Sequence, residues 1–172
     1  CLNCKVPMCQ KGCPISTHIP QFIEQIKNGN LEEAYKILQE NNIMSNICSN
    51  VCPYEECCVG NCIKGIKGEP IQVNKLEKYV NNWARKNNVI YVNERQKSNN
   101  IKIAVVGSGP AGIECAVELS KKGFEVTIFE KEEEIGGLLT YGIPGFRLPR
   151  DITQNLTRRI KSLGINIQTN IE

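Results

Sequence analysis

Cysteines are concentrated at the start of this 172-residue chain, where nine of its ten fall within the first 62 residues. They form two blocks, and in each block one cysteine is followed directly by proline. The first block reads C-x2-C-x4-C-x3-C-P over residues 1–14, and the second places five cysteines between residues 48 and 62. Such a short polar segment has little apolar surface to bury, so this density of thiols indicates either crosslinks or bound metal.

Disulfides are the first alternative, and they are typical of short secreted domains with an even number of cysteines. The dense region holds nine, an odd number. No apolar leader is visible, although a chain that begins at Cys1 rather than Met is expected to lack its true start. A charged fraction of 23%, the lack of an apolar run near 18 residues and the nucleotide motif described below favour a cytoplasmic protein.

Zinc is the second alternative, because structural zinc sites use Cys-x2–4-Cys pairs and Cys1 with Cys4 could form half of one. Two-cluster ferredoxins instead use a Cys-x2-Cys-x2-Cys-x3-Cys-Pro run, whose last cysteine binds the other cluster. The four cysteines of the first block have the same order of spacings, except that four residues rather than two separate the second cysteine from the third. The spacing therefore favours iron–sulfur clusters.

The segments between and after the cysteine blocks are predicted to be helical. One helix is expected from Pro20 to Gly29, because proline suits a first turn and glycine a C-terminal end. Asn30 and Glu33 form a capping-box pattern that predicts a second helix. A third amphipathic helix is expected to start near Lys75.

The sequence changes character at residue 101. Residues 101–106 predict a buried parallel strand, a helix is expected to run to about Lys122, and strands are expected at 126–129 and 165–168. The helix before the last strand is predicted to be capped by Asp151. This order is about half of a doubly wound sheet, so we expect a truncated domain.

The predicted organisation has three parts. They are an α-helical two-cluster iron–sulfur domain over residues 1–85, a polar linker over 86–100, and part of an α/β Rossmann-like domain over 101–172.

A dinucleotide fingerprint lies directly after the first strand of the second domain, at Gly107-Ser108-Gly109-Pro110-Ala111-Gly112. In this fingerprint Gly107 allows the tight turn, Gly109 lets the backbone approach a pyrophosphate, and Gly112 lets the helix pack on the strand. Glu130 ends the next strand, where an acidic side chain binds ribose hydroxyls. That carboxylate would repel a 2′-phosphate, so the loop is predicted to bind FAD or NAD, and the later Gly136-Gly137 pair favours FAD.

With both halves considered, the chain resembles the small (beta) subunit family of NADPH-dependent glutamate synthase, which is related to the N-terminal region of dihydropyrimidine dehydrogenase. The resemblance covers essentially the whole sequence. It is carried by CLNCKVPMCQKGCP, ICSNVCPYEECCVGNC, GEPIQVNKLEKYV, VVGSGPAGIECA, IFEKEEEIGGLLTYGIPGFRLP and LGINIQTN.

The resemblance implies two 4Fe–4S clusters and FAD as cofactors. It assigns one cluster to Cys1, Cys4, Cys9 and Cys62, and the other to Cys13, Cys52, Cys58 and Glu77. On the flavin side it implies contacts from Gly107, Ser108, Gly109, Pro110, Ala111, Gly112, Glu130, Leu138 and Arg147.

Some of these assignments have alternatives. Glu77 could instead form a capping box with Asn74, and Cys57 could exchange roles with Cys58. Cys48 is expected to be a buried thiol outside the ligand set, and Cys115 a small core residue.

The function implied is the electron-input module of an iron–sulfur flavoprotein oxidoreductase. It would pass electrons from NAD(P)H through FAD and the clusters to a large partner subunit for glutamate synthesis. Alternatives are a bifurcating NAD(P)H–ferredoxin or sulfide-linked relative, or a non-catalytic metal-binding redox module. No catalytic acid or nucleophile is expected, the NADPH site is expected downstream of this sequence, and the fragment alone is expected to be inactive. With a net charge of +3 and scattered Lys and Arg, neither nucleic acid nor a membrane is expected as a partner.

Overall fold

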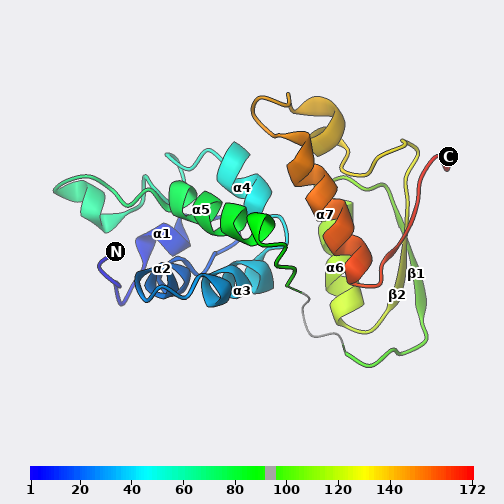
Figure 1. Cartoon of the computed structure of the whole chain (residues 1–172), viewed down its shortest axis with the longest axis horizontal. Coiled ribbons are helices and arrows are strands. Elements are labelled where there is room, and N and C mark those ends of the chain that lie inside the picture. Colours follow the sequence, from blue (N-terminus) through cyan, green and yellow to red (C-terminus); the bar gives the residue numbers. More distant parts are fainter. Residues whose placement is uncertain (92–95) are drawn as a thin grey trace. The chain divides into compact units, whose positions relative to one another are not determined.

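The computed structural model describes residues 1–91 and 96–172, and it divides the chain into two compact units, Cys1–Tyr91 and Val92–Glu172 (Figure 1). Part of the predicted linker, residues 92–95, lies outside the described residues.

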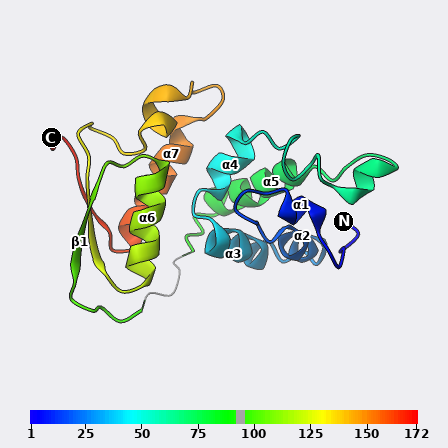
Figure 2. The same cartoon turned by 180° about the vertical axis from the view of Figure 1, so that it is seen from behind.

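The first unit is helical, in agreement with the sequence. Its elements are α1 (Met8–Lys11), α2 (Ile19–Lys27), α3 (Leu31–Asn41), α4 (Ser45–Val51), the 3-10 helix η1 (Ile63–Ile66) and α5 (Val73–Lys86). Helix α2 packs beside α3, and α4 beside α5 (Figures 1 and 2). Phe22, Leu38 and Val80 are among the fully buried side chains of their shared core.

Local signals explain most of these boundaries. Pro20 lies in the first turn of α2, and Gly29 follows that helix with a φ of +74°, a left-handed conformation that favours glycine. The Oδ1 of Asn30 accepts a 3.2 Å hydrogen bond from the backbone N–H of Glu33, so the predicted cap of α3 is confirmed. Helix α4 was not predicted, because its seven residues carry no cap signal.

The start of the third predicted helix requires a correction. Helix α5 begins at Val73 with Gln72 as its N-cap residue, two residues before the predicted start. Asn74 therefore lies inside the first turn, and the capping box that would join it to Glu77 does not form. The boundary was placed too late for two reasons. Val73, a β-branched residue, is not typical of a helix start, and Asn74 with Glu77 forms a capping pattern that predicts a start two residues later.

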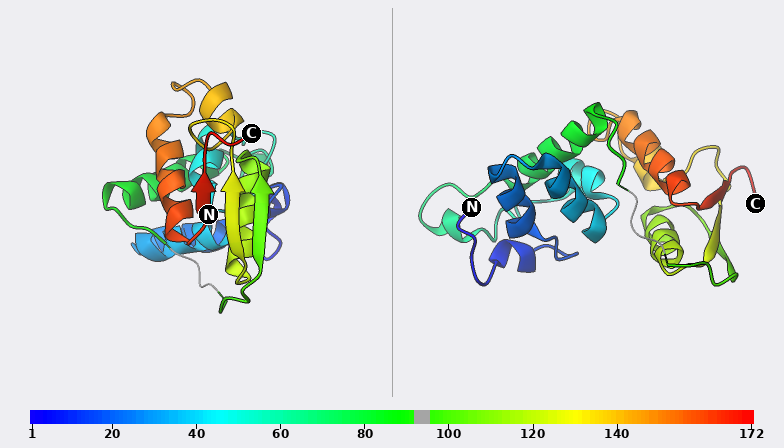
Figure 3. Two further views of the ribbon diagram at one scale, coloured as in Figure 1. Left: turned by 90° about the vertical axis from the view of Figure 1, so that its right-hand side faces the viewer. Right: turned by 60° about the horizontal axis from the view of Figure 1, so that its bottom comes forward.

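The second unit contains a three-stranded parallel sheet in the order β1-β2-β3. Its elements are β1 (Lys102–Val106), α6 (Pro110–Lys121), β2 (Glu125–Phe129), the π-helix η2 (Leu138–Gly142), α7 (Arg150–Ser162) and β3 (Asn166–Gln168). Helices α6 and α7 lie on the same face of the sheet (Figure 3, left). The register pairs Val105 with Ile128, and Ile128 with Ile167.

Three expectations for this unit were wrong in detail. Strand β1 is not buried, because α6 and α7 cover only one face of the sheet, and Val106 is 88% exposed. Asp151 does not cap α7; the N-cap residue is Pro149, and Asp151 lies in the first turn. Residues 138–142, for which no helix was expected, form the π-helix η2 between β2 and α7. Among the described residues, no helix is long and apolar enough to cross a membrane.

Candidate metal centres and nucleotide site

The predicted ligands of the first cluster gather around one small cavity of about 20 Å³ in the first unit. Its walls are formed by the thiols and by apolar side chains such as Ile23 and Ile71. The thiols are those of Cys1, Cys4, Cys9 and Cys62. The backbone N–H of Ile71 donates a 3.4 Å hydrogen bond to the Sγ of Cys62, and burial raises the pKa of the Cys9 thiol.

The two cysteine blocks meet where Gly12 approaches Asn61. A Cβ atom on Gly12 would lie 2.5 Å from the Nδ2 of Asn61, so a larger residue here would have to displace this side chain. Asn61 is held in turn by a 2.7 Å hydrogen bond from Nδ2 to the carbonyl of Cys57. This contact brings Cys13 and Cys62, the neighbours of Gly12 and Asn61, into adjacent parts of the unit.

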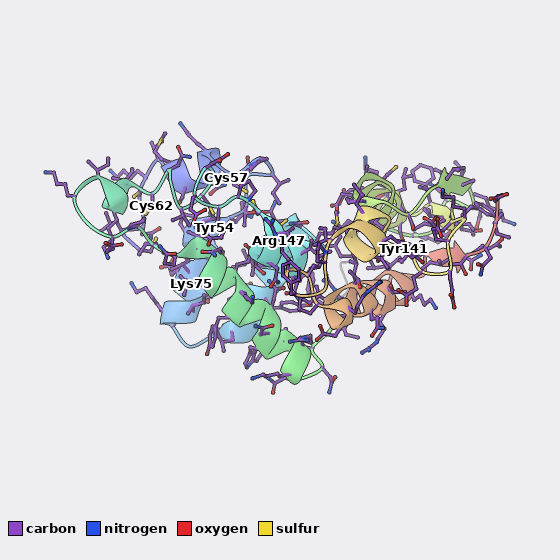
Figure 4. All side chains as sticks on the ribbon, turned by 90° about the horizontal axis from the view of Figure 1, so that it is seen from above. Tyr54, Cys57, Cys62, Lys75, Tyr141 and Arg147 are labelled. Carbon is purple, nitrogen blue, oxygen red and sulfur yellow. The ribbon has the colours of Figure 1, made fainter. Side chains whose placement is uncertain are left out.

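The predicted ligands of the second cluster line a larger cavity of about 120 Å³. The cavity also receives both cysteines whose roles the sequence left open. Its sulfur and carboxylate donors belong to Cys13, Cys48, Cys52, Cys57, Cys58 and Glu77. Figure 4 labels Cys62 from the first cavity and Cys57 from the second.

The surroundings of three thiols in the second cavity, those of Cys48, Cys52 and Cys58, raise their pKa values and favour the protonated form. Burial, reinforced by the negative charge of Glu77, raises the pKa of Cys48 to about 12 and that of Cys58 to about 12. Burial and the neighbouring Cys57 raise the pKa of Cys52 to about 11. A bound metal cation would oppose this effect of burial, because it favours the thiolate form of a coordinating cysteine.

Glu77 lies at the inner wall of this cavity and is only 9% exposed. Burial raises its pKa to about 7, although a hydrogen bond from Ser45 opposes the rise. The Oγ of Ser45 donates to the Oε1 of Glu77 over 2.8 Å, and Asn81 donates from Nδ2 to the Oγ of Ser45 over 2.8 Å. The Nε2 of Gln39 completes the chain with a 3.2 Å bond to the Oδ1 of Asn81.

This network replaces the capping alternative for Glu77, since its carboxylate contacts Ser45 rather than the start of α5. Within residues 1–91 and 96–172, no three His, Cys, Asp or Glu side chains are arranged to hold a single metal ion. The donors instead surround the two cavities.

A third cavity, of about 860 Å³, lies at the carboxyl ends of β1 and β2 in the second unit. Gly107 turns the chain there with a φ of +90°. A Cβ on Gly112 would lie 2.2 Å from the carbonyl oxygen of Gly107, which agrees with the close packing predicted for this glycine. A Cβ on Gly109 would meet no atom within 4 Å, so this position is open to a ligand.

Glu130 is held against the glycine loop. Its Oε2 accepts a 2.9 Å hydrogen bond from the backbone N–H of Ser108 and a second bond from the Ser108 hydroxyl. Its Oε1 accepts a 3.0 Å bond from the backbone N–H of Glu132. Burial raises the pKa of Glu130, but these hydrogen bonds outweigh it and leave the pKa below its ordinary value.

The second glycine pair packs on the same loop. The backbone N–H of Gly136 donates to the carbonyl of Ser108 over 3.0 Å, and a Cβ on Gly137 would lie 3.2 Å from the Cα of Gly109. Both residues have positive φ, of +120° and +53°. The pair therefore approaches the glycine loop closely, and Gly137 also lines the cavity, so its predicted approach to a cofactor stays a prediction.

The remaining predicted nucleotide residues fall into two groups. Leu138 lines the cavity, whereas Arg147 is exposed between η2 and α7 and does not. Tyr141 lines the cavity and was missed, although it lies within the GGLLTYG motif; its hydroxyl accepts a 2.9 Å bond from the backbone N–H of Glu134 (Figure 4). Pro110, Ala111 and Gly112 begin α6 behind the loop.

Cys115 was predicted to be a core residue and is exposed. The buried face of α6 carries Ile113, Ala116 and Val117. Residue 115 is two positions from Ile113 and therefore about 200° around the helix, on its outer side.

Comparison with known proteins agrees with this division of the chain. Residues 1–89 match the family described as dihydropyrimidine dehydrogenase domain II, 4Fe-4S cluster, and residues 105–153 match the NAD(P)-binding Rossmann-like domain.

Three relatives align with the whole chain. The glutamate synthase [NADPH] small chain of Azospirillum brasilense is 35% identical over 173 residues, which cover 36% of its length. The PreT subunit of NAD-dependent dihydropyrimidine dehydrogenase from Salmonella typhimurium is 34% identical, with 41% of its length covered. The Escherichia coli glutamate synthase [NADPH] small chain is 31% identical, with 36% covered. The chain thus spans well under half of these relatives, and it belongs to the iron–sulfur family of dihydropyrimidine dehydrogenase domain II, which confirms the predicted kinship with glutamate synthase small chains.

Proposed function

We propose that this chain is the electron-input module of an iron–sulfur flavoprotein oxidoreductase. In the intact protein, electrons from NAD(P)H would reach a large partner subunit for glutamate synthesis through FAD and two 4Fe–4S clusters. The observation that carries the proposal is the division of the thiols between two cavities. Each cavity collects one of the two ligand sets that the family resemblance implies.

The donor sets suit iron–sulfur clusters. Cys1, Cys4, Cys9 and Cys62 would hold the first cluster, and Cys13, Cys52, Cys58 and Glu77 would hold the second. Thiolates are the usual ligands of such clusters. A metal core binds thiolates rather than thiols, so it takes the place of the thiol protons when it assembles. We therefore expect cluster assembly to release protons and to stabilise the first unit.

The nucleotide cavity suits the adenosine half of FAD. Its volume of about 860 Å³ lies within the range of about 300–1,000 Å³ typical of ligand sites. The Oε1 of Glu130 accepts a hydrogen bond from the backbone N–H of Glu132, and a carboxylate oxygen can accept a further one, here from a ribose hydroxyl. Ser108 fixes this carboxylate in place, and Glu132 adds a second negative group that would oppose a 2′-phosphate.

FAD, when bound, supplies the chemistry that converts a two-electron hydride into single electrons for the clusters. The side chains of this chain bind, orient and exclude water; none of them is proposed as an acid, base or nucleophile. Apolar residues such as Ile19 and Val73 border both metal cavities and would limit the access of water to them.

A second candidate has the same chemistry with another acceptor. The PreT subunits are 34% identical to this chain, nearly as similar as the glutamate synthase small chain at 35%. The acceptor could thus be a pyrimidine-reducing partner. The two acceptors can be separated with the reduced intact protein. It is mixed either with a glutamate synthase large subunit, 2-oxoglutarate and glutamine, or with a pyrimidine-reducing subunit and a pyrimidine, and the mixture that consumes its electrons identifies the acceptor.

Oxygen-free preparation of the chain tests the module itself. We expect a brown protein with broad absorbance near 400 nm, about eight irons and about eight inorganic sulfides per chain. A colourless protein that binds only zinc would overturn the proposal. Because the chain spans well under half the length of its relatives, FAD binding is best measured in the full-length protein.

A further inference from the structure

The amino-terminal end of α5 lies at the second metal cavity. Val73, Asn74 and Glu77 all line the cavity and come from the first two turns of this 14-residue helix. The N-terminus of a helix carries a partial positive charge from its unpaired N–H groups. The cavity therefore has one electropositive wall among its acidic donors.

Asn74 is the unexplained residue of that wall. Its side chain is only 8% exposed, and its Oδ1 accepts no hydrogen bond. It does not cap α5, because Gln72 occupies that position. A buried polar group without a partner destabilises the fold, so a partner outside the polypeptide would account for an amide here.

We propose that the side-chain amide of Asn74 donates a hydrogen bond to the cluster of the second cavity and thereby raises its reduction potential. This inference rests on the proposed function. A half-turn of the Asn74 amide group exchanges the positions of its nitrogen and oxygen. Which atom faces the cavity is decided by the hydrogen-bond partners around it. An electron-rich cluster would turn the NH₂ group inward.

The electrostatic effect has a definite sign. Three thiolates and the Glu77 carboxylate bring four negative charges to this cluster, and reduction adds one electron without breaking a bond or moving a proton. An N–H donor and the end of α5 stabilise the more negative, reduced state more than the oxidised one. Loss of the donor should therefore lower the potential.

The two cavities differ in their donor atoms and in the hydrogen-bond donors beside them. The first has four cysteines and a backbone donor from Ile71 to Cys62. The second has Glu77 as an oxygen donor and the Asn74 amide, three residues apart on one helix. Asn74 would thus act on the cluster that has the oxygen donor and leave the other one unaffected.

The test is a dithionite titration of the iron-loaded chain, followed by electron paramagnetic resonance, in which the potentials of both clusters are measured. In Asn74→Leu, which keeps the shape but removes the donor, we expect one cluster to become about tenfold harder to reduce, or 59 mV for one electron. The other cluster should not change. The matched control is Asn82→Leu on the same helix; Asn82 does not line the cavity, and its Oδ1 accepts a bond from Arg85.

Each outcome decides the question. Eight irons with unchanged potentials in Asn74→Leu, or an equal shift in Asn82→Leu, would overturn the role of Asn74 and leave the proposed function intact. Wild-type chain without clusters would overturn both. If Asn74→Leu does not load iron, Asn74→Asp is titrated instead; it replaces the donor with a negative group, so an unchanged potential would again refute the inference.

Discussion

The hydroxyl of Ser45 donates a 2.8 Å hydrogen bond to the Oε1 of Glu77, across 32 residues of sequence. Helices α4 and α5 pack together, and this bond joins them at the wall of the second metal cavity. The same hydroxyl accepts a hydrogen bond from Asn81, so it orients the carboxylate and is itself oriented. The position of Glu77 thus depends on residues outside the ligand set.

Ser45→Ala should destabilise the first unit. The substitution removes the side-chain hydroxyl that Glu77 contacts, and a buried carboxylate that loses its donor costs about 1–3 kcal/mol. The free energy of unfolding can be followed by the fluorescence of Trp83, the only tryptophan of the chain. Ser49→Ala is the matched control, because this buried serine donates to the carbonyl of Asn46 and accepts from the Asn50 amide, with no carboxylate as its partner. Equal losses of unfolding free energy in the two variants would show that the Ser45–Glu77 bond contributes no more to stability than the hydroxyl of Ser49.

The surplus thiols of the second cavity can be sorted by iron content. Cys52→Ala should reduce the iron from about eight to about four atoms per chain, because it removes one proposed ligand of a four-iron cluster. Cys48→Ala should retain about eight, since the Sγ of Cys48 already accepts a 3.3 Å bond from the Nδ2 of Asn42. Cys57→Ala should also retain about eight. Loss of four irons in Cys48→Ala would place this residue in the ligand set.

The sequence predicted local features better than distant ones. The glycine loop and the cap at Asn30 are short-range patterns, and the structure reproduces both. The Ser45–Glu77 bond could not be predicted, because it depends on how α4 packs on α5. The exposure of Val106 was missed for a similar reason: an apolar run predicts a strand but does not say how many faces are covered.

Glu130 should make the second unit sensitive to acid. Its folded-state pKa lies below the ordinary value of 4.5, so its charged form stabilises the fold above that pH. This contribution should be lost as the pH falls below about 4.5 and through the folded-state value. Urea unfolding followed by circular dichroism between pH 3 and 6 should show a flatter profile in Glu130→Gln, on the order of one proton less. Glu133→Gln, at an exposed position nearby, should retain the wild-type slope; the same slope in all three proteins would contradict the prediction.

Two glycines of the nucleotide loop should respond differently to the same substitution. Gly112→Ala places a Cβ 2.2 Å from the carbonyl oxygen of Gly107, and we expect a loss of about 1–3 kcal/mol in unfolding free energy because the helix must shift from the strand. Gly109→Ala adds a Cβ with no atom within 4 Å and has an ordinary φ of −64°, so its stability should be unchanged.

The affinity for FAD should respond to the two substitutions in the opposite way. The Cβ of Gly109→Ala would occupy the space through which a pyrophosphate approaches the backbone, so FAD binding to the full-length protein should weaken at least about tenfold, or 1.4 kcal/mol, with no loss of stability. Gly112→Ala should weaken FAD binding only to the extent that it increases the unfolded fraction of the protein. Fluorescence titration with FAD beside urea unfolding separates the two effects. Wild-type affinity in Gly109→Ala would show that the dinucleotide does not approach this loop, whereas unchanged stability in Gly112→Ala would show that α6 can move away from β1 at no cost.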